Sequence, residues 1–339
     1  MPPIALVSGA SARALHLGEF LPPLLAGAAY LTLYLRRLRT LSRERRAPEA
    51  WRVGVFVSGV ALVTLVQLPP VDGFADEVLA AHMVQHIVIG EVASLLIVLG
   101  LTGPMLQPLL RLPVTRGLRA LANPPVALGL WALNLYLWHL PLLYQLAIRH
   151  DLVHALEHAC LLWCGTLLWL ALLGPLPKPA WFRGWAELGY VFAVRTVGAV
   201  LGNVLIWAQT VVYPVYRPTD ASYGLDPLSD QNLAGAAMMV AQMVLTALLV
   251  AWLFLRFARR EEEQQLLLDL ASESGIALDR ARAARAADAG AGERLRRVLM
   301  AQATEGAGEG AGVDTDRESA VAGADAEAGA ESRLEAASR

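Results

Sequence analysis

Apolar residues in this chain gather into long runs rather than into the short alternating patterns of a soluble protein. Each run holds about twenty residues, and a helix of that length crosses the ~30 Å hydrocarbon core of a bilayer. The pattern predicts an all-α, polytopic membrane bundle over residues 1–260. Its seven transmembrane helices are expected at about residues 15–36, 52–70, 79–101, 124–147, 152–173, 186–212 and 231–256.

Charges between the runs predict the orientation of the bundle. Lys and Arg concentrate in alternate connections, above all in residues 36–52, while the other connections are mainly acidic. Because basic loops stay in the cytoplasm, the N-terminus is expected outside and the C-terminus in the cytoplasm. The first apolar run lacks the features of a cleaved signal peptide, so we expect it to be retained.

Composition supports this interpretation and separates off a tail. Hydrophobic residues make up 56% of the chain and charged residues 17%, against about 25% charged in soluble proteins. Residues 261–339 carry 17 acidic and 9 basic side chains, which leaves 13 and 19 in the bundle. We expect this Ala- and Gly-rich segment to be a cytoplasmic tail, partly helical and then disordered.

All seven histidines fall in the predicted outer half of the bundle. His82 and His86 are one helical turn apart in the third predicted helix, and His154 and His158 repeat that spacing in the fifth. His139, in the fourth helix, lies at a similar depth. Since polar groups within a span face the interior, three helices should bring up to five imidazoles together.

Such a cluster favours ligation of a metal or of haem. Imidazole binds copper, zinc, iron and nickel, while thioethers such as Met83 and Met238 suit Cu(I). Each residue also has a simpler interpretation, because membrane methionines mostly fill space and single histidines near an interface mostly bond to carbonyls. Two paired histidine motifs and a fifth histidine at one depth favour the ligand hypothesis.

Two further charges lie deeper, near the predicted mid-plane. Glu91 is ~18 Å below the outer end of its helix, and Arg195 lies at a similar depth in the sixth. Because an unpaired charge is costly there, we expect these residues to form a structural ion pair. Glu157, beside His158, could orient an imidazole or accept its proton.

Motifs that would indicate other functions were not found in the sequence. It contains no phosphate-binding glycine loop, no HExxH zinc-protease motif and no nucleophile elbow, so no enzymatic activity is expected. The basic residues of the first inner loop follow from orientation in the membrane, and no nucleic-acid binding is expected.

Three segments carry a resemblance to a known family: HMVQH at 82–86, LWHLPLLYQLAIRHDLVHALEH at 137–158 and DQNLAGAAMM at 230–239. They resemble the CtaG-type cytochrome c oxidase assembly factors over about residues 15–258. The family motif HMxQH matches His82, Met83, Gln85 and His86, and WHLP matches Trp138, His139, Leu140 and Pro141. The motif HxxEH matches His154, Glu157 and His158, and DQxxAGxxM matches Asp230, Gln231, Ala234, Gly235 and Met238. Met239 departs from the pattern, where tryptophan is expected.

The resemblance implies a multi-pass protein of a bacterial plasma membrane that assists assembly of haem-copper oxidases. It would bind copper, as Cu(I), and deliver it to an oxidase subunit, and a periplasmic or extracellular copper chaperone could supply the metal. A b-type haem protein, with iron held between His86 and His158 or His139, is the alternative. A transporter is less favoured, since no repeat and no broken helix is evident, and a structural role for the histidines also stays open.

Overall fold

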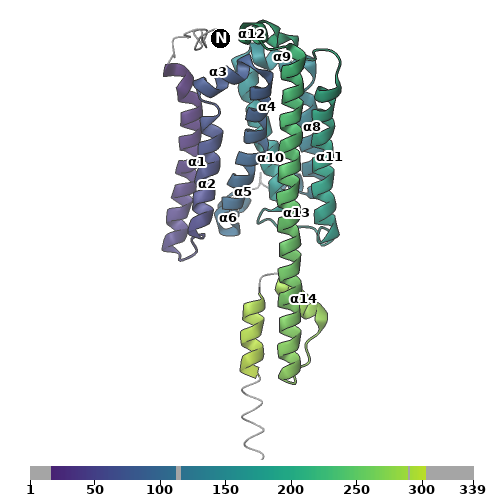
Figure 1. The fold of residues 1–339 in the computed structure, drawn as a ribbon. Coiled ribbons are helices and arrows are strands. Elements are labelled where there is room, and N and C mark those ends of the chain that lie inside the picture. Colours follow the sequence, from purple (N-terminus) through teal and green to yellow (C-terminus); the bar gives the residue numbers. More distant parts are fainter. Residues whose placement is uncertain (1–16, 112–115, 289–290, 303–339) are drawn as a thin grey trace, which may run out of the picture. The chain divides into compact units, whose positions relative to one another are not determined.

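The computed structural model describes residues 17–111, 116–288 and 291–302. Throughout these residues the regular structure is helical, with no strand, which confirms the all-α class (Figure 1). His16 and the segment 303–339, where the tail is expected to be disordered, lie outside the described residues. Contacts divide the chain into two compact units, residues 1–250 and 251–339. The domain boundary predicted at residue 260 stays a prediction.

Four helical stretches in the described residues are long and apolar enough to cross a membrane. They are Leu79–Gly100, Asp151–Leu172 (α10), Trp185–Trp207 (α11) and Pro227–Glu273 (α13). Two bent pairs raise the number to six: α2 (Ala50–Leu65) with α3 (Pro69–Glu77), and α8 (Pro124–Trp138) with α9 (Pro141–Arg149). The membrane class is thereby supported. The first predicted span, which falls on α1 (Leu17–Arg43), the total of seven spans and the orientation of the termini stay predictions.

Both bent pairs break at a proline. Leu68 and Leu140, which precede Pro69 and Pro141, have extended backbone with ψ of 144° and 131°. A residue before proline is driven out of the helical region by the proline ring, so each helix stops and a new one starts at an angle. The angles are 57° and 70°. The expectation of unbroken helices was therefore wrong. Within each of these two apolar runs the first helix ends just before a proline, and a second helix begins at Pro69 or Pro141.

The stretch Leu79–Gly100 also departs from a regular helix. α4 (Leu79–Ile87) and α5 (Ser94–Gly100) are joined by the π-helical segment η1 (Val88–Ala93), which contains Glu91. A π-turn displaces carbonyls from their usual partners. Here Ser94 Oγ donates to the Gly90 carbonyl at 2.6 Å, and Trp169 Nε1 of α10 donates to the Glu91 carbonyl at 3.0 Å. The side chains of Ser94 and Trp169 thus supply hydrogen bonds to backbone carbonyls, which lipid cannot provide.

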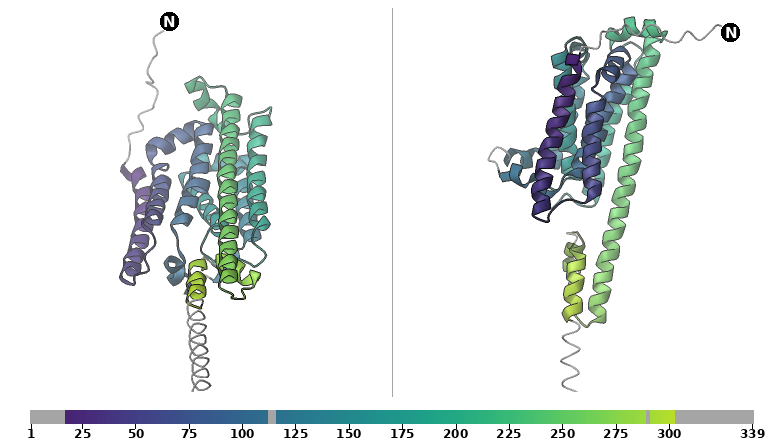
Figure 2. Two further views of the ribbon diagram at one scale, coloured as in Figure 1. Left: turned by 60° about the horizontal axis from the view of Figure 1, so that its bottom comes forward. Right: turned by 90° about the vertical axis from the view of Figure 1, so that its left-hand side faces the viewer.

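Helices of the first unit pack closely around this irregular stretch. Figure 2 shows α1 beside α2, and α2 contacts α5 while α10 contacts α8, η1 and α5. Tyr34 of α1 stacks on Phe56 of α2 at 3.8 Å between ring centroids. At Gly165 a Cβ atom would lie 1.9 Å from the Gly90 carbonyl oxygen. Only glycine therefore permits the observed approach of α10 to η1.

Short helices gather at one end of this unit, which we call the capped end; they are α3, α9, η3 (Pro214–Tyr216) and α12 (Arg217–Tyr223) (Figure 1). Tyr223 of α12 donates a hydrogen bond to Glu77 of α3 at 2.5 Å, and its ring meets Phe74 edge-on. Tyr216 of η3 bonds to Tyr144 of α9 at 2.9 Å. The connection after α11 thus forms an ordered cap joined to α3 and α9.

The remaining elements are short or belong to the second unit. α6 (Gly103–Arg111) and α7 (Arg116–Leu121) lie between α5 and α8 in the chain. In the second unit the end of α13, α14 (Arg280–Asp288) and a helix at 292–302 share a small core of Leu267, Ala271, Ala283 and Leu299.

Candidate metal centre

The five histidines singled out from the sequence come together at the capped end. Ring centroids of His82 and His86 are 4.3 Å apart, and those of His154 and His158 are 4.2 Å apart. Contacts also join the two helices, since His82 lies 5.2 Å from His154 and 6.2 Å from His158. His139 lies 5.6 Å from His86. All five are buried, with 7% exposure or less.

The position of α4 depends on a residue far along the chain. Asp230, near the start of α13, accepts hydrogen bonds from the backbone N–H groups of Leu79 at 2.7 Å and Ala80 at 3.0 Å. These are among the first amides of α4 and have no partner within the helix. Asp230 therefore caps the turn that carries His82. Gln231 fixes the chain after α11 in a similar way. Its side-chain oxygen accepts from the Val212 N–H, and its amide nitrogen donates to the carbonyls of Leu205 and Thr210.

His139 takes its place from the break between α8 and α9. It follows the last residue of α8, and its Nδ1 lies 2.7 Å from the Leu135 carbonyl oxygen. A carbonyl can only accept, so Nδ1 carries the proton and Nε2 keeps a lone pair. That Nε2 is buried and has no hydrogen-bond partner in the part of the chain that the structure describes. His139 therefore keeps one ring nitrogen with a lone pair, and its ring centroid lies 5.6 Å from that of His86.

Three overlapping groups within the described residues have ligand atoms within 4.8 Å of one another. The innermost, His82, His86 and His158, is wholly buried and is called the inner triad below. The other two combine histidines with carboxylates: Asp72, His154 and His158; and Asp76, His82 and His154. From the sequence, Asp72 and Asp76 belonged only to one of the mainly acidic connections. Their spacing of four residues just after Pro69–Pro70 was the available signal, since it places both on one helix face.

Buried polar atoms of the cluster have unused bonding capacity. His82 Nε2 and His86 Nε2 are 2.8 Å apart, and His86 Nε2 is 3.6 Å from Glu157 Oε1. The buried atoms with no hydrogen-bond partner among the described residues include Nδ1 of His86, Nε2 of His154, Nε2 of His158 and both carboxylate oxygens of Glu157. Burying such atoms unpaired is costly. An ion bound among the nitrogens would remove part of that cost.

A layer of tyrosines closes the cluster. Tyr144 of α9 is fully buried, with its ring 5.2 Å from His82, 6.4 Å from His86 and 4.1 Å from Tyr213. Tyr213 donates to the His139 carbonyl at 2.8 Å. The aromatic rings cover the histidines while their hydroxyl groups bond to one another and to the backbone.

The two predicted methionine ligands are buried, but their role stays a prediction. Met83 follows His82 by one residue, a rotation of about 100° around the helix, so the two side chains leave different faces. Met238 is also buried on α13. Its neighbour Met239 instead accepts a hydrogen bond from Asn203 of α11, 3.4 Å from Nδ2 to Sδ.

Glu91 and Arg195 lie at a second buried polar site, below the histidines. Arg195 Nη1 donates to Glu91 Oε2 at 2.5 Å and to Gln242 Oε1 at 2.7 Å. Gln242 Nε2 in turn donates to Glu91 Oε1 at 2.9 Å. The guanidinium also lies over the Trp169 ring at 5.6 Å. The pairing expected from depth is therefore part of a network that η1, α10, α11 and α13 share, and Gln242 was not anticipated.

Comparison with known proteins identifies the family. The sequence profile described as "Cytochrome c oxidase caa3 assembly factor (Caa3_CtaG)" matches residues 11–260. This chain belongs to that family. The match includes every histidine of the cluster and confirms the resemblance seen in the motifs. No solved structure matches the chain.

Mycobacterial proteins are among the relatives of this chain. The uncharacterised proteins Mb0105 of Mycobacterium bovis and MT0111 of Mycobacterium tuberculosis are each 25% identical over 255 residues, 67% of this chain and 38% of theirs. The uncharacterised protein ML1998 of Mycobacterium leprae is 22% identical over 277 residues, 75% of this chain and 42% of its own. The chain thus spans about two fifths of the length of these relatives, in a bacterial setting.

Proposed function

We propose that this assembly factor binds copper at the inner triad and delivers it to a subunit of a haem-copper oxidase. The observation that carries the proposal is the convergence of three buried imidazoles from two helices, with ligand atoms within 4.8 Å of one another. Copper is the cargo here, and no catalytic role is proposed for the protein.

Geometry of the triad suits a small ion after a slight adjustment. A metal bound at about 2.0 Å to each nitrogen in tetrahedral geometry separates neighbouring nitrogens by ~3.3 Å. The 2.8 Å between the Nε2 atoms of His82 and His86 must therefore open by about half an ångström. Small side-chain rotations supply that much. Unpaired His158 Nε2 is already available as a third ligand.

The donor set also favours release. Imidazole accepts copper readily, but three neutral nitrogens without a thiolate make a weaker site than a closed cysteine cage. Nearby His139 and His154 could replace a triad ligand as the ion leaves. Thioether ligation by Met83 or Met238 would further favour Cu(I), and we retain it as part of the proposal.

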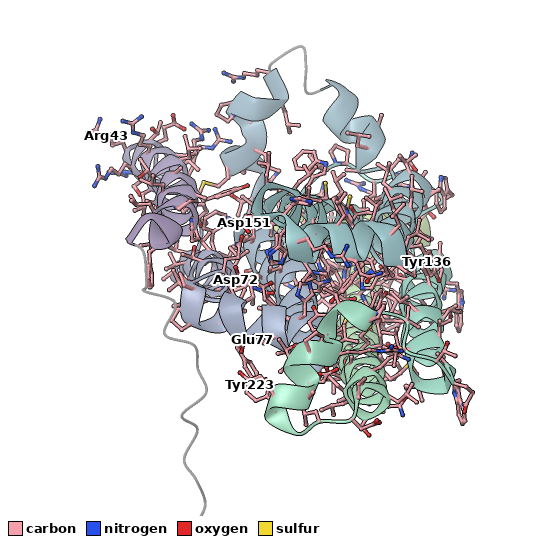
Figure 3. All side chains as sticks on the ribbon, turned by 90° about the horizontal axis from the view of Figure 1, so that it is seen from above. Arg43, Asp72, Glu77, Tyr136, Asp151 and Tyr223 are labelled. Carbon is pink, nitrogen blue, oxygen red and sulfur yellow. The ribbon has the colours of Figure 1, made fainter. Side chains whose placement is uncertain are left out.

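Location follows from the predicted orientation. The capped end would face the outside of the bacterial plasma membrane, where a copper chaperone could donate the ion, and the bundle would present it to an oxidase subunit within the bilayer. Acidic residues Asp72, Asp76, Glu77 and Asp151 lie at this end and would attract cations. Figure 3 shows Asp72, Glu77 and Asp151 from above.

The haem alternative gains no support from the comparisons. Two axial ligands of one iron stand about 4 Å apart on opposite faces of the macrocycle. His86 and His158 could meet that condition only with the porphyrin between them. The rings of His82 and Tyr144 pack close to His86, with ring centroids 4.3 Å and 6.4 Å away, and would have to move to admit a porphyrin.

Copper binding can be measured directly on purified protein. The full chain in detergent, under anaerobic reducing conditions, is titrated with Cu(I) against bicinchoninate, and metal content is determined. We expect the wild type to retain copper and His86→Gln to lose about tenfold or more in affinity, because losing even a residue that supports a metal ligand typically costs about 10–100-fold. Absence of a Soret band in the visible spectrum would agree with this assignment.

The matched control is His150→Gln. His150 is exposed and precedes α10, so its replacement should leave copper affinity unchanged. In cells, His86→Gln should lower oxidase activity while His150→Gln does not, at equal amounts of folded protein. Copper-free wild-type protein, or equal affinity of the two variants, would overturn the proposal.

A further inference from the structure

Two carboxylates of α3 extend the histidine cluster toward the surface. Asp72 and Asp76 are one turn apart, and Asp76 Oδ1 lies 3.8 Å from His154 Nδ1. Each joins a compact group of potential ligands, Asp72 with His154 and His158, and Asp76 with His82 and His154. Neither residue falls in the motifs that carried the family resemblance.

Exposure changes in steps from these carboxylates to the inner triad. The side chain of Asp76 is 29% exposed and that of His154 is 9% exposed. His82 is fully buried. An ion arriving from water would therefore meet the carboxylates first.

Asp72 is held in place from within the bundle. Gln85 of α4 donates to Asp72 Oδ1 at 2.6 Å and to the Val66 carbonyl, at the α2–α3 break, at 2.7 Å. Gln85 is buried and immediately precedes His86. The bend after α2 is thus joined to α4 at the level of the triad, which fixes the outer ligands relative to the inner ones.

We propose that Asp72, Asp76 and His154 form a loading site, through which copper reaches the inner triad. The inference rests on the proposed function and adds a second, outer binding position. Carboxylates are hard ligands that hold a soft ion such as Cu(I) weakly, whereas imidazole holds it better. The ion would therefore pass inward.

Shared ligands allow this passage without release of the ion. His82 and His158 belong both to the triad and to the outer groups. As the ion moves, metal–oxygen bonds to Asp72 and Asp76 break, and metal–nitrogen bonds to His158, His82 and then His86 form. The oxidation state of the ion does not change, and neither carboxylate is consumed.

Loading kinetics test this proposal. Cu(I) is supplied as its bicinchoninate complex to the full-length protein in nanodiscs, and both the transfer rate and the final occupancy are recorded. Asp76→Asn should slow transfer by about tenfold, as expected when a steering and ligating charge is lost. Final occupancy should stay within about twofold of wild type, because the triad is intact. Asp72→Asn is the second variant and should act in the same direction.

Glu77→Gln is the matched control, since it removes the same charge from the next position of the same helix. It should slow loading only by the loss of long-range attraction, so in high salt, where that attraction is screened, it should load at the wild-type rate while Asp76→Asn stays slow. Loading of Asp76→Asn at the Glu77→Gln rate would overturn the inference. So would a fall in occupancy as large as that of His86→Gln, because Asp76 would then be a permanent ligand. Failure of wild type to bind copper would instead refute the proposed function.

Discussion

Removing the charge of Glu91 should destabilise the bundle more than any exposed substitution. In Glu91→Gln the guanidinium of Arg195 loses a carboxylate 2.5 Å away while staying buried. At an effective dielectric constant of 20, charges at that distance attract by about 7 kcal/mol. The Gln242 oxygen at 2.7 Å remains as a neutral acceptor and offsets part of this loss. We expect the free energy of unfolding to fall by about 3–5 kcal/mol.

The assay is a double-mutant cycle on the purified protein in one detergent. Unfolding is followed for wild type, Glu91→Gln, Arg195→Gln and the double variant. Because the double variant buries no unpaired charge, its loss should be smaller than the sum of the single losses. A loss below about 1 kcal/mol in Glu91→Gln, the range of exposed pairs, or strict additivity of the two changes, would refute the argument. Copper content per folded molecule should stay at the wild-type level, since the network lies below the triad.

Three further substitutions test other parts of the structure. Gly165→Ala should lower the free energy of unfolding by about 3 kcal/mol or more, because its Cβ would lie 1.9 Å from the Gly90 carbonyl oxygen. The control, Gly129→Ala, has open space around its Cβ and should change the free energy of unfolding by less than about 1 kcal/mol. Asp230→Ala should cost about 1–2 kcal/mol and weaken copper retention, since it removes the cap of α4; wild-type stability would contradict the capping role. Burial, together with the nearby carboxylate of Asp230, raises the pKa of Asp220 to about 6. Because the folded protein favours the protonated form, ionisation of Asp220 opposes folding. The free energy of unfolding should therefore be highest below pH ~4 and should fall by about 2–3 kcal/mol as the pH rises through 6. Asp220→Asn should flatten that part of the pH profile, and an unchanged profile would assign the pH dependence to other groups.

Much of the candidate site could be predicted because helices convert spacing into geometry. His82 and His86, like His154 and His158, had to share a face, and the rise per residue put both pairs at one depth. Membrane insertion then leaves polar groups few directions other than inward. The structure contains the histidine cluster that this reasoning anticipates.

Other features depended on contacts between distant parts of the chain. Asp230 lies about 150 residues from the α4 amides that it caps. Gln242 carried no sign of its bonds to Glu91 and Arg195, because glutamine on a membrane helix fits many environments. Asp72 was seen as part of an acidic loop, and only the break at Pro69 turns it toward the histidines.

By itself, then, the sequence determined the membrane class, the family and the histidines that would meet, because apolar run length and helical period are local properties. Tertiary structure decided how the site is built and closed. The π-turn at Glu91 accommodates α10 through Gly165, and the bends at Pro69 and Pro141 fold α3 and α9 over the end of the bundle. Those outcomes arise from packing between helices, where one residue's position depends on partners that no local pattern specifies.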